Sequence, residues 1–118
     1  MNSLGPRVSD LSAAVALFRG LADPTRLAIV QRLSLEEARV VDLTRQLALA
    51  QSTVSGHLAC LRDCGLVTAR PEGRQMFYSL ARPELAGLLA AAERLLEATG
   101  WRVALCPSYG TGASEMTG

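Results

Sequence analysis

The spacing of the apolar residues changes twice along the chain, and this alternation limits the folds that the chain can adopt. From residue 9 to residue 64, apolar positions recur every three or four residues, as on one face of a helix. From Leu66 to Leu80 they alternate, as in a strand, and from Pro83 to Gly100 the helical period returns. Aromatic residues make up only 4% of the chain, so we expect a core of Leu, Ala and Val. The predicted fold is mainly α with one β-hairpin.

Four helices are predicted before the hairpin. The first covers residues 9 to 21. The second begins at Asp23-Pro24, because Asp supplies an N-cap oxygen and Pro fills a position whose N–H has no helical partner. A third helix is expected over residues 41 to 47, and a fourth over residues 52 to 64, with Gly65 as its C-cap. The last two are short and are joined by a tight connection.

The hairpin and one long helix complete the expected fold. Strands over residues 66 to 70 and 74 to 80 flank a turn at Pro71-Glu72-Gly73. The helix that Pro83 opens continues to Gly100 and carries an apolar stripe along one face. Such a stripe needs a partner surface.

The length of 118 residues allows one domain of ordinary size. We expect this domain over residues 9 to 106, between a disordered segment at 1 to 8 and a flexible tail at 107 to 118 that is rich in Gly, Ser and Thr. The first residues lack the apolar run of a secretory signal, and no stretch has the roughly 18 apolar residues of a membrane span. These features predict a cytoplasmic protein with no membrane partner.

The charge of the chain is nearly balanced. Twelve basic residues, all of them Arg, stand against eleven acidic residues, which gives a formal net charge of +1. No global field therefore draws the chain to nucleic acid or lipid, and any such binding must use a local patch.

The order of the predicted elements is that of a winged helix-turn-helix module. The helix at 52 to 64 has small hydrogen-bonding side chains in its first half, which can reach base edges and phosphates in a major groove. The candidate DNA-binding residues at the start of this helix are Gln51, Ser52, Thr53, Ser55 and His57. The candidates on the hairpin are Arg70, Arg74 and Gln75. The alternatives are a solvated helix face for the helix residues and a charged turn for the hairpin residues. His57 has two further alternatives, a local hydrogen bond and a place as a metal ligand beside the helix cysteines, which lie three and seven residues further on.

Three segments resemble the ArsR/SmtB family of metal-responsive repressors. They are ADPTRL at 22 to 27, STVSGHLACLRDCGLV at 52 to 67 and EGRQMFYSL at 72 to 80. The resemblance implies a homodimeric repressor whose first and last helices pair across a two-fold axis, so that two recognition helices read a pseudo-palindrome in double-stranded operator DNA. The pairing would bury the apolar residues of both helices, namely Leu11, Val15, Phe18, Leu85, Leu88, Leu89, Ala92, Leu95 and Leu96.

The three cysteines, Cys60, Cys64 and Cys106, resemble those of the CmtR type of cadmium and lead sensor within this family. In that type, two helix cysteines and one C-terminal cysteine bind the ion. Independently of the resemblance, residues four apart on a helix have Cβ atoms about 5–6 Å apart, a span that a large soft ion bridges and a disulfide does not. Three thiolates suit cadmium or lead, and zinc, a further candidate, prefers a fourth ligand. The alternative is that the helix pair are small apolar residues under the helix.

The sequence thus predicts a repressor that binds operator DNA when metal-free and is released by cadmium or lead. Two alternatives stay open: a thiol-based redox or arsenite-responsive repressor of the same fold, and an interaction module that does not bind DNA. An enzyme is not expected, because no Ser-His-Asp or paired-carboxylate arrangement and no phosphate loop are present.

Overall fold

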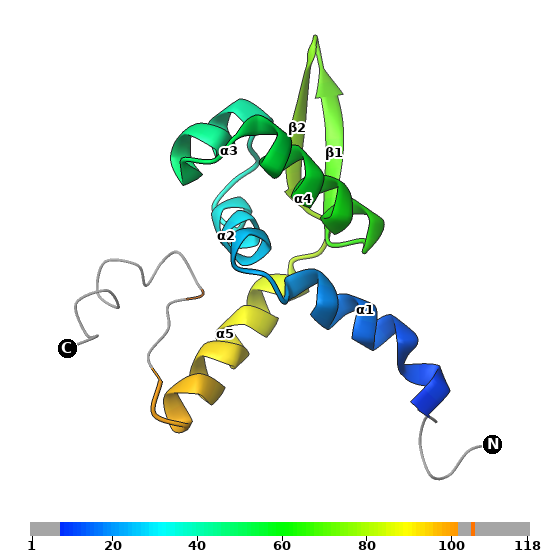
Figure 1. Ribbon diagram of the computed structural model, residues 1–118, viewed down its shortest axis with the longest axis vertical. Helices are drawn as coiled ribbons and strands as arrows, with labels where there is room; N and C mark the ends of the chain where they lie inside the picture. The colour runs from blue at the N-terminus through cyan, green and yellow to red at the C-terminus, as the bar shows by residue number, and fades with distance from the viewer. Residues whose placement is uncertain (1–7, 102–104, 106–118) are drawn as a thin grey trace.

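The computed structural model describes residues 8 to 101 and residue 105. In chain order its elements are η1 (Val8–Leu11), α1 (Ser12–Leu21), α2 (Pro24–Leu33), α3 (Val40–Leu47), α4 (Gln51–Asp63), β1 (Val67–Glu72), β2 (Gln75–Leu80) and α5 (Glu84–Ala98) (Figure 1). This order confirms the predicted mainly α fold with a β-hairpin wing. In the described ranges, no helix has both the length and the apolar character that crossing a membrane requires.

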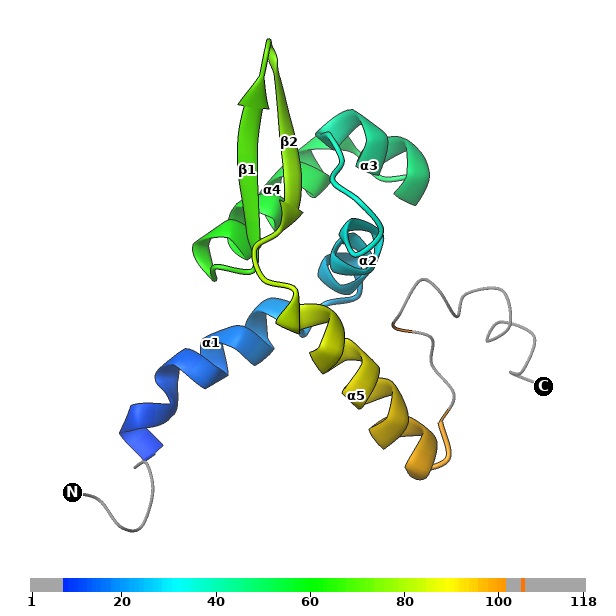
Figure 2. The same ribbon diagram turned by 180° about the vertical axis from the view of Figure 1, so that it is seen from behind.

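The elements form a body and two arms. α2, α3, α4 and the hairpin lie together and form the body (Figures 1 and 2). α1 and α5 are the arms, which extend from the end of the body that is farthest from the turn of the hairpin and diverge from each other in both views. The core lies at the centre of the body. It consists of the buried residues Leu21, Ile29, Val30, Leu33, Ala38, Leu43, Val54, Leu58, Leu61, Val67, Leu85 and Leu89.

Local chemistry explains where the helices of the body begin and end. Asp23 caps α2 as predicted, since its carboxylate accepts a hydrogen bond from the backbone N–H of Arg26 at 3.0 Å. Gly65 follows α4 with φ +77, and the N–H of Leu66 bonds back to the carbonyl of Leu61 at 2.9 Å. Ala48 ends α3 in the left-handed region, at φ 57, which starts the tight turn into α4.

The first helix differs from its prediction. Its regular part begins at Ser12, and a 3-10 turn from Val8 to Leu11 precedes it. Leu11 occupies the N-cap position of α1, and its side chain has no oxygen to accept the first amide hydrogens. Irregular winding of the first turn follows from this missing cap.

The turn of the hairpin is tighter than predicted, and the second strand fixes the hairpin to the body. β1 pairs antiparallel with β2 from Val67 opposite Leu80 to Glu72 opposite Gln75, so the turn is shorter than the predicted one. Gly73 takes a positive φ of 63 there. Tyr78 exchanges two backbone hydrogen bonds with Ala38, of 2.9 and 2.8 Å, and these anchor the wing beside α3.

Residues 1 to 7, 102 to 104 and 106 to 118 lie outside the described residues. The predicted flexible tail and the predicted role of Cys106 therefore stay predictions. The same holds for the predicted disordered segment at 1 to 8, except for its last residue, Val8, which begins η1.

Candidate DNA-binding helix and thiol pair

The two halves of α4 differ in what they expose. Val54, Leu58 and Leu61 are at most 1% exposed and fix one face of the helix in the core. The four predicted contact residues of the first turns, Gln51, Ser52, Thr53 and Ser55, are all exposed. No side chain caps the helix at Ala50, so the first amides of α4 are free of side-chain partners. Such a helix start can bind phosphate oxygens while its polar side chains meet base edges.

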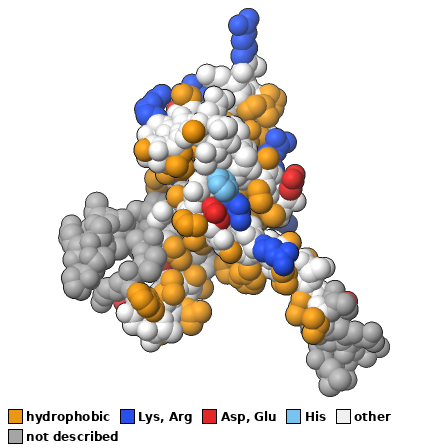
Figure 3. All heavy atoms as spheres, viewed as in Figure 1, with side chains coloured by type: hydrophobic (Ala, Val, Ile, Leu, Met, Phe, Trp, Pro, Cys, Tyr) orange, Lys and Arg blue, Asp and Glu red, His pale blue; other side chains and the backbone are white. Residues whose placement is uncertain are grey.

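His57 does not point outward like the other candidates of this helix. Its ring is 25% exposed, its Nδ1 lies 3.3 Å from Nη1 of Arg26, and its Nε2 lies 3.9 Å from Oδ2 of Asp23. In Figure 3 the imidazole lies next to an acidic and a basic side chain. The local hydrogen bond considered as an alternative for His57 is therefore present.

The three hairpin candidates differ in how far they are free to contact DNA. Arg70 forms ion pairs of 2.6 Å with both Glu37 and Glu72, and its guanidinium lies 5.0 Å from the centre of the Phe77 ring. Both carboxylates raise the pKa of Arg70. A phosphate would have to displace these two carboxylates.

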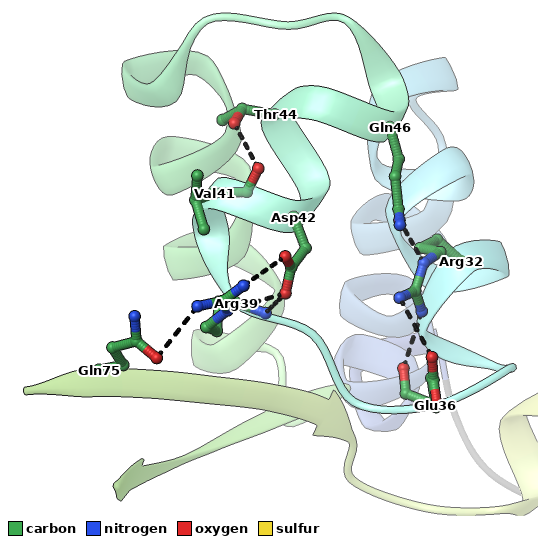
Figure 4. A network of polar contacts seen from close by, with 8 residues as sticks. All are labelled: Arg32, Glu36, Arg39, Val41, Asp42, Thr44, Gln46 and Gln75. Atoms are coloured by element: carbon green, nitrogen blue, oxygen red, sulfur yellow. Dashed lines mark hydrogen bonds and ion pairs between the residues drawn. The ribbon is translucent and has the colours of Figure 1, made fainter. Parts of the chain in front are cut away.

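Arg74 and Gln75 lie at the turn end of the wing, and both are exposed. The side-chain carbonyl of Gln75 accepts a hydrogen bond from Nη1 of Arg39 at 3.2 Å (Figure 4). Of the two arginines on the wing, Arg74 is therefore better placed than Arg70 to contact a phosphate.

Cys60 lies in the last turns of α4 and Cys64 is the C-cap residue that follows the helix, one residue earlier than the predicted helix end; both are free thiols and partly buried. Burial raises the pKa of the Cys64 thiol, and the charge and hydrogen bond of Cys60 add to this shift, while the cation of Arg26 opposes it. A Cβ added at Gly20 in α1 would lie 3.3 Å from the Cys64 sulfur, so this sulfur packs on the backbone of α1. Because Cys60 contributes to the pKa shift of Cys64, the two thiols are neighbours.

The third predicted ligand is outside the described residues, but its neighbour is placed. The backbone N–H of Leu105 donates a hydrogen bond to Oε2 of Glu93, a buried carboxylate on α5. Leu105 also packs against the core. Across residues 8 to 101 and 105, no group of three or more His, Cys, Asp or Glu side chains could hold a metal.

The predicted dimer residues divide into three sets by exposure. Leu11, Val15 and Phe18 on α1 are 40, 45 and 57% exposed, and Leu95 on α5 is 67% exposed. Leu88, Ala92 and Leu96 are partly buried. By contrast, Leu85 and Leu89 are buried in the core of their own chain, at 6 and 3% exposure, because the start of α5 packs against the body. Leu85 and Leu89 therefore contribute to the core of their own chain.

Two arginines with structural roles were not singled out from the sequence. Arg39 is the N-cap residue of α3 and pairs with Asp42 (Figure 4). The distances to the Asp42 carboxylate are 2.9 and 3.0 Å from its guanidinium and 3.0 Å from its backbone N–H. These bonds lower the pKa of Asp42 to about 2. The spacing of three residues between Arg39 and Asp42, at a helix start, is the signal that could have indicated this pair. Arg26 is the second, and its signal is the same spacing from Asp23.

Comparisons with known proteins agree with this geometry. Residues 23 to 69 match the family model described as bacterial regulatory protein, arsR family. The chain is 49% identical over 78 residues to the HTH-type transcriptional regulator CmtR of Mycobacterium tuberculosis H37Rv, a match that covers 66% of each chain. It is 41% identical over 78 residues to a probable mercury resistance operon repressor of Streptomyces lividans, covering 66% of this chain and 62% of that one. The matched region thus spans slightly less than two thirds of both relatives.

A solved structure supports the same architecture. The homodimeric winged helix-turn-helix DNA-binding domain of a possible ArsR-family regulator from Mycobacterium bovis superposes with a TM-score of 0.72 at 27% identity. The superposition covers 84% of this chain and 93% of that domain.

Proposed function

The chain belongs to the arsR family of bacterial regulatory proteins, and from this premise we propose that it is a metal-responsive transcriptional repressor. As a homodimer in the cytoplasm, it binds operator DNA when free of metal. Cadmium or lead, bound by the thiolates of Cys60, Cys64 and Cys106, releases it. The family is one of DNA-binding regulators, and no enzymatic activity is part of this proposal.

The observation that carries the proposal is the sharing of one helix by two kinds of chemistry. The first turns of α4 expose Gln51, Ser52 and Thr53, while Cys60 lies in its last turns and Cys64 caps its end. A restraint on the sulfur end of a 13-residue helix is felt at its polar end, because the helix moves as one body. A differential effect of about 1 to 3 kcal/mol would change operator affinity roughly five- to 150-fold, and DNA would weaken metal binding by the same factor.

The donor set favours a soft ion. Thiolates select soft, thiophilic metals, and hard ions such as magnesium prefer oxygen ligands. The relative from Streptomyces lividans is named as a mercury resistance repressor, which supports a thiophilic signal. With three sulfurs, cadmium or lead is satisfied, whereas zinc would require a fourth ligand.

The test is a cadmium titration of the native chain and of Cys60→Ser, Cys64→Ser and Cys106→Ser. Ultraviolet absorption follows thiolate-to-metal charge transfer, and fluorescence anisotropy follows a labelled duplex selected from a random-sequence library by the metal-free protein. We expect cadmium to lower the DNA affinity of the native chain at least about five-fold, and each substitution to reduce both signals. Magnesium serves as the hard-ion control and should change neither.

Three outcomes would contradict parts of this proposal. Unchanged DNA affinity on cadmium binding would remove the switch, and a rise would invert its sign. Full response of Cys106→Ser would remove the tail ligand.

The proximity of the two thiols favours one alternative, a redox or arsenite-responsive repressor. In that case, peroxide alone releases the duplex, and cadmium gives no charge-transfer absorption. The same two instruments therefore distinguish the two functions in one set of samples.

A further inference from the structure

The guanidinium of Arg26 connects three helices. From α2, its Nε donates to the carbonyl of Gly20 at 2.7 Å and its Nη2 to the carbonyl of Arg19 at 3.1 Å, both in the last turn of α1. Its Nη1 lies 3.3 Å from Nδ1 of His57 in the middle of α4. The last carbonyls of a helix lack helical partners and carry the negative end of its dipole, so a cation is well placed there.

The position of Arg26 is set by the start of its own helix. The carboxylate of Asp23 accepts from the backbone N–H of Arg26 at 3.0 Å, and this bond is the main cause of the lowered pKa of Asp23. The hydrogen bond that caps α2 therefore also fixes the backbone of Arg26, the residue whose guanidinium binds the end of α1. Both Asp23 and His57 are partly buried, at 30 and 25% side-chain exposure, which limits competition from water.

The contact with Arg26 fixes the role of one ring nitrogen of His57. A guanidinium only donates hydrogen bonds and keeps its charge in proteins, so Nδ1 of His57 must accept. Nε2, the other ring nitrogen, lies 3.9 Å from the carboxylate of Asp23. The Nδ1 edge of the ring is thus committed to the anchor.

The end of α1 contacts the region of α4 at a second position, in addition to the contact through Arg26. Gly20 lies against the sulfur of Cys64, which is seven residues, or two helical turns, beyond His57. The helix proposed to read DNA is therefore fixed to the helix proposed to form the dimer at two points, one of them through Arg26.

We propose that Arg26 is a positioning residue that holds α4 at His57 in the orientation required for operator binding, and that His57 serves this anchor through Nδ1 rather than reading a base. This inference rests on the proposed operator binding by α4. It assigns to Arg26 no contact with DNA.

A matched pair of substitutions at His57 tests the role of its two nitrogens. The amide oxygen of Asn lies near the position of Nδ1, and that of Gln near the position of Nε2. We expect His57→Asn to bind the library-selected duplex within about two-fold of the native chain, and His57→Gln to bind about ten-fold more weakly, since a hydrogen bond to a charged partner is lost. The reverse order, or equal binding by both variants, overturns the inference.

Arg26→Gln tests the anchor itself and separates it from a phosphate contact. We expect about a ten-fold or greater loss of affinity, with the slope of log affinity against log salt unchanged, because no phosphate contact is removed. A slope that falls by about one identifies Arg26 as a phosphate ligand and overturns the proposal, as does unchanged affinity. Circular dichroism and sedimentation verify that Arg26→Gln is a folded dimer. If it does not fold, Arg26→Lys takes its place, because lysine keeps the positive charge but lacks the forked set of N–H donors.

Nuclear magnetic resonance of the ring nitrogens tests the geometry without DNA. We expect the native chain to show the proton of His57 on Nε2, and Arg26→Gln to lose this preference. A native ring protonated on Nδ1 at neutral pH is incompatible with the anchor. If the native chain shows the expected tautomer but binds no duplex from the library, the proposed function fails while the contact itself stands.

Discussion

At Cys64, burial opposes the form of sulfur that binds metal. The raised pKa means that the thiol keeps its proton at neutral pH, and a bound soft ion requires the thiolate. Metal binding must therefore release this proton. The nearby cation of Arg26 acts in the opposite direction and reduces the cost.

This exchange predicts that cadmium affinity rises with pH. At any pH below the thiol pKa, each thiol that loses its proton on binding contributes about a ten-fold gain in apparent affinity per pH unit. The gain ends as the pH passes the raised pKa of Cys64. Competition with a chelator of known proton affinity, at several pH values, measures the slope.

Cys64→Ser is the control for that slope. Removal of this thiol should lower the slope by about one proton, along with the affinity. An affinity of the native chain that does not vary with pH would mean that the sulfurs are already ionised in the free protein, against the raised pKa of Cys64.

At the level of helices and strands, the sequence predicts best what neighbouring residues determine. Asp23-Pro24 at the start of α2 acts within one turn and is confirmed. Gly65 was predicted as the C-cap of α4, but the C-cap residue is Cys64, and Gly65 follows it with a positive φ. The wing extends through Pro71 and Glu72, which were predicted as turn. Each strand of a two-stranded ribbon directs every second amide to solvent, and a proline is accommodated at such a position.

Contacts between elements could not be predicted, because they depend on how the helices pack. The candidate set for DNA binding included Arg70 and His57 as equals of Arg74 and Ser52. Packing instead brings Glu37, 33 residues away, to Arg70, and Arg26, 31 residues away, to His57. Residue type alone does not distinguish a basic side chain held by carboxylates from one that is free to meet a phosphate.

The wing allows a direct test of this distinction. In the double variant Glu37→Gln and Glu72→Gln, Arg70 loses both carboxylate partners, and two negative charges leave the face proposed to approach DNA. We expect higher affinity for the library-selected duplex and a salt slope steeper by about one, because one more phosphate contact forms. Anisotropy titrations at several salt concentrations measure both.

Arg74→Ala provides the comparison in the opposite direction. We expect weaker binding to all sequences and a salt slope shallower by about one. If the double variant has the affinity and slope of the native chain, Arg70 does not reach the DNA and the phosphate contacts of the wing are limited to its turn.

In the whole molecule, the apolar surface is concentrated on the two arms. Phe18 of α1 and Leu95 of α5 are 57 and 67% exposed, and Leu11 and Val15 continue the surface along α1. Hydrophobic side chains also lie over both arms in Figure 3. Because Leu85 and Leu89 fix only the start of α5 in the core, the exposed remainder is the part that a second copy can cover.

Phe18→Asp should therefore separate the dimer without unfolding the chain. A carboxylate buried without a partner at the interface, once in each copy, is expected to weaken dimerisation about 100-fold or more, while the core of the body is unchanged. Operator affinity should fall with it, because the two half-sites are then bound independently. Leu35→Asp is the matched control, since Leu35 is equally apolar and 63% exposed but lies between α2 and α3. Sedimentation velocity distinguishes the outcomes: if both variants stay dimeric, α1 is not the interface, and the two recognition helices must be related by contacts elsewhere on the chain.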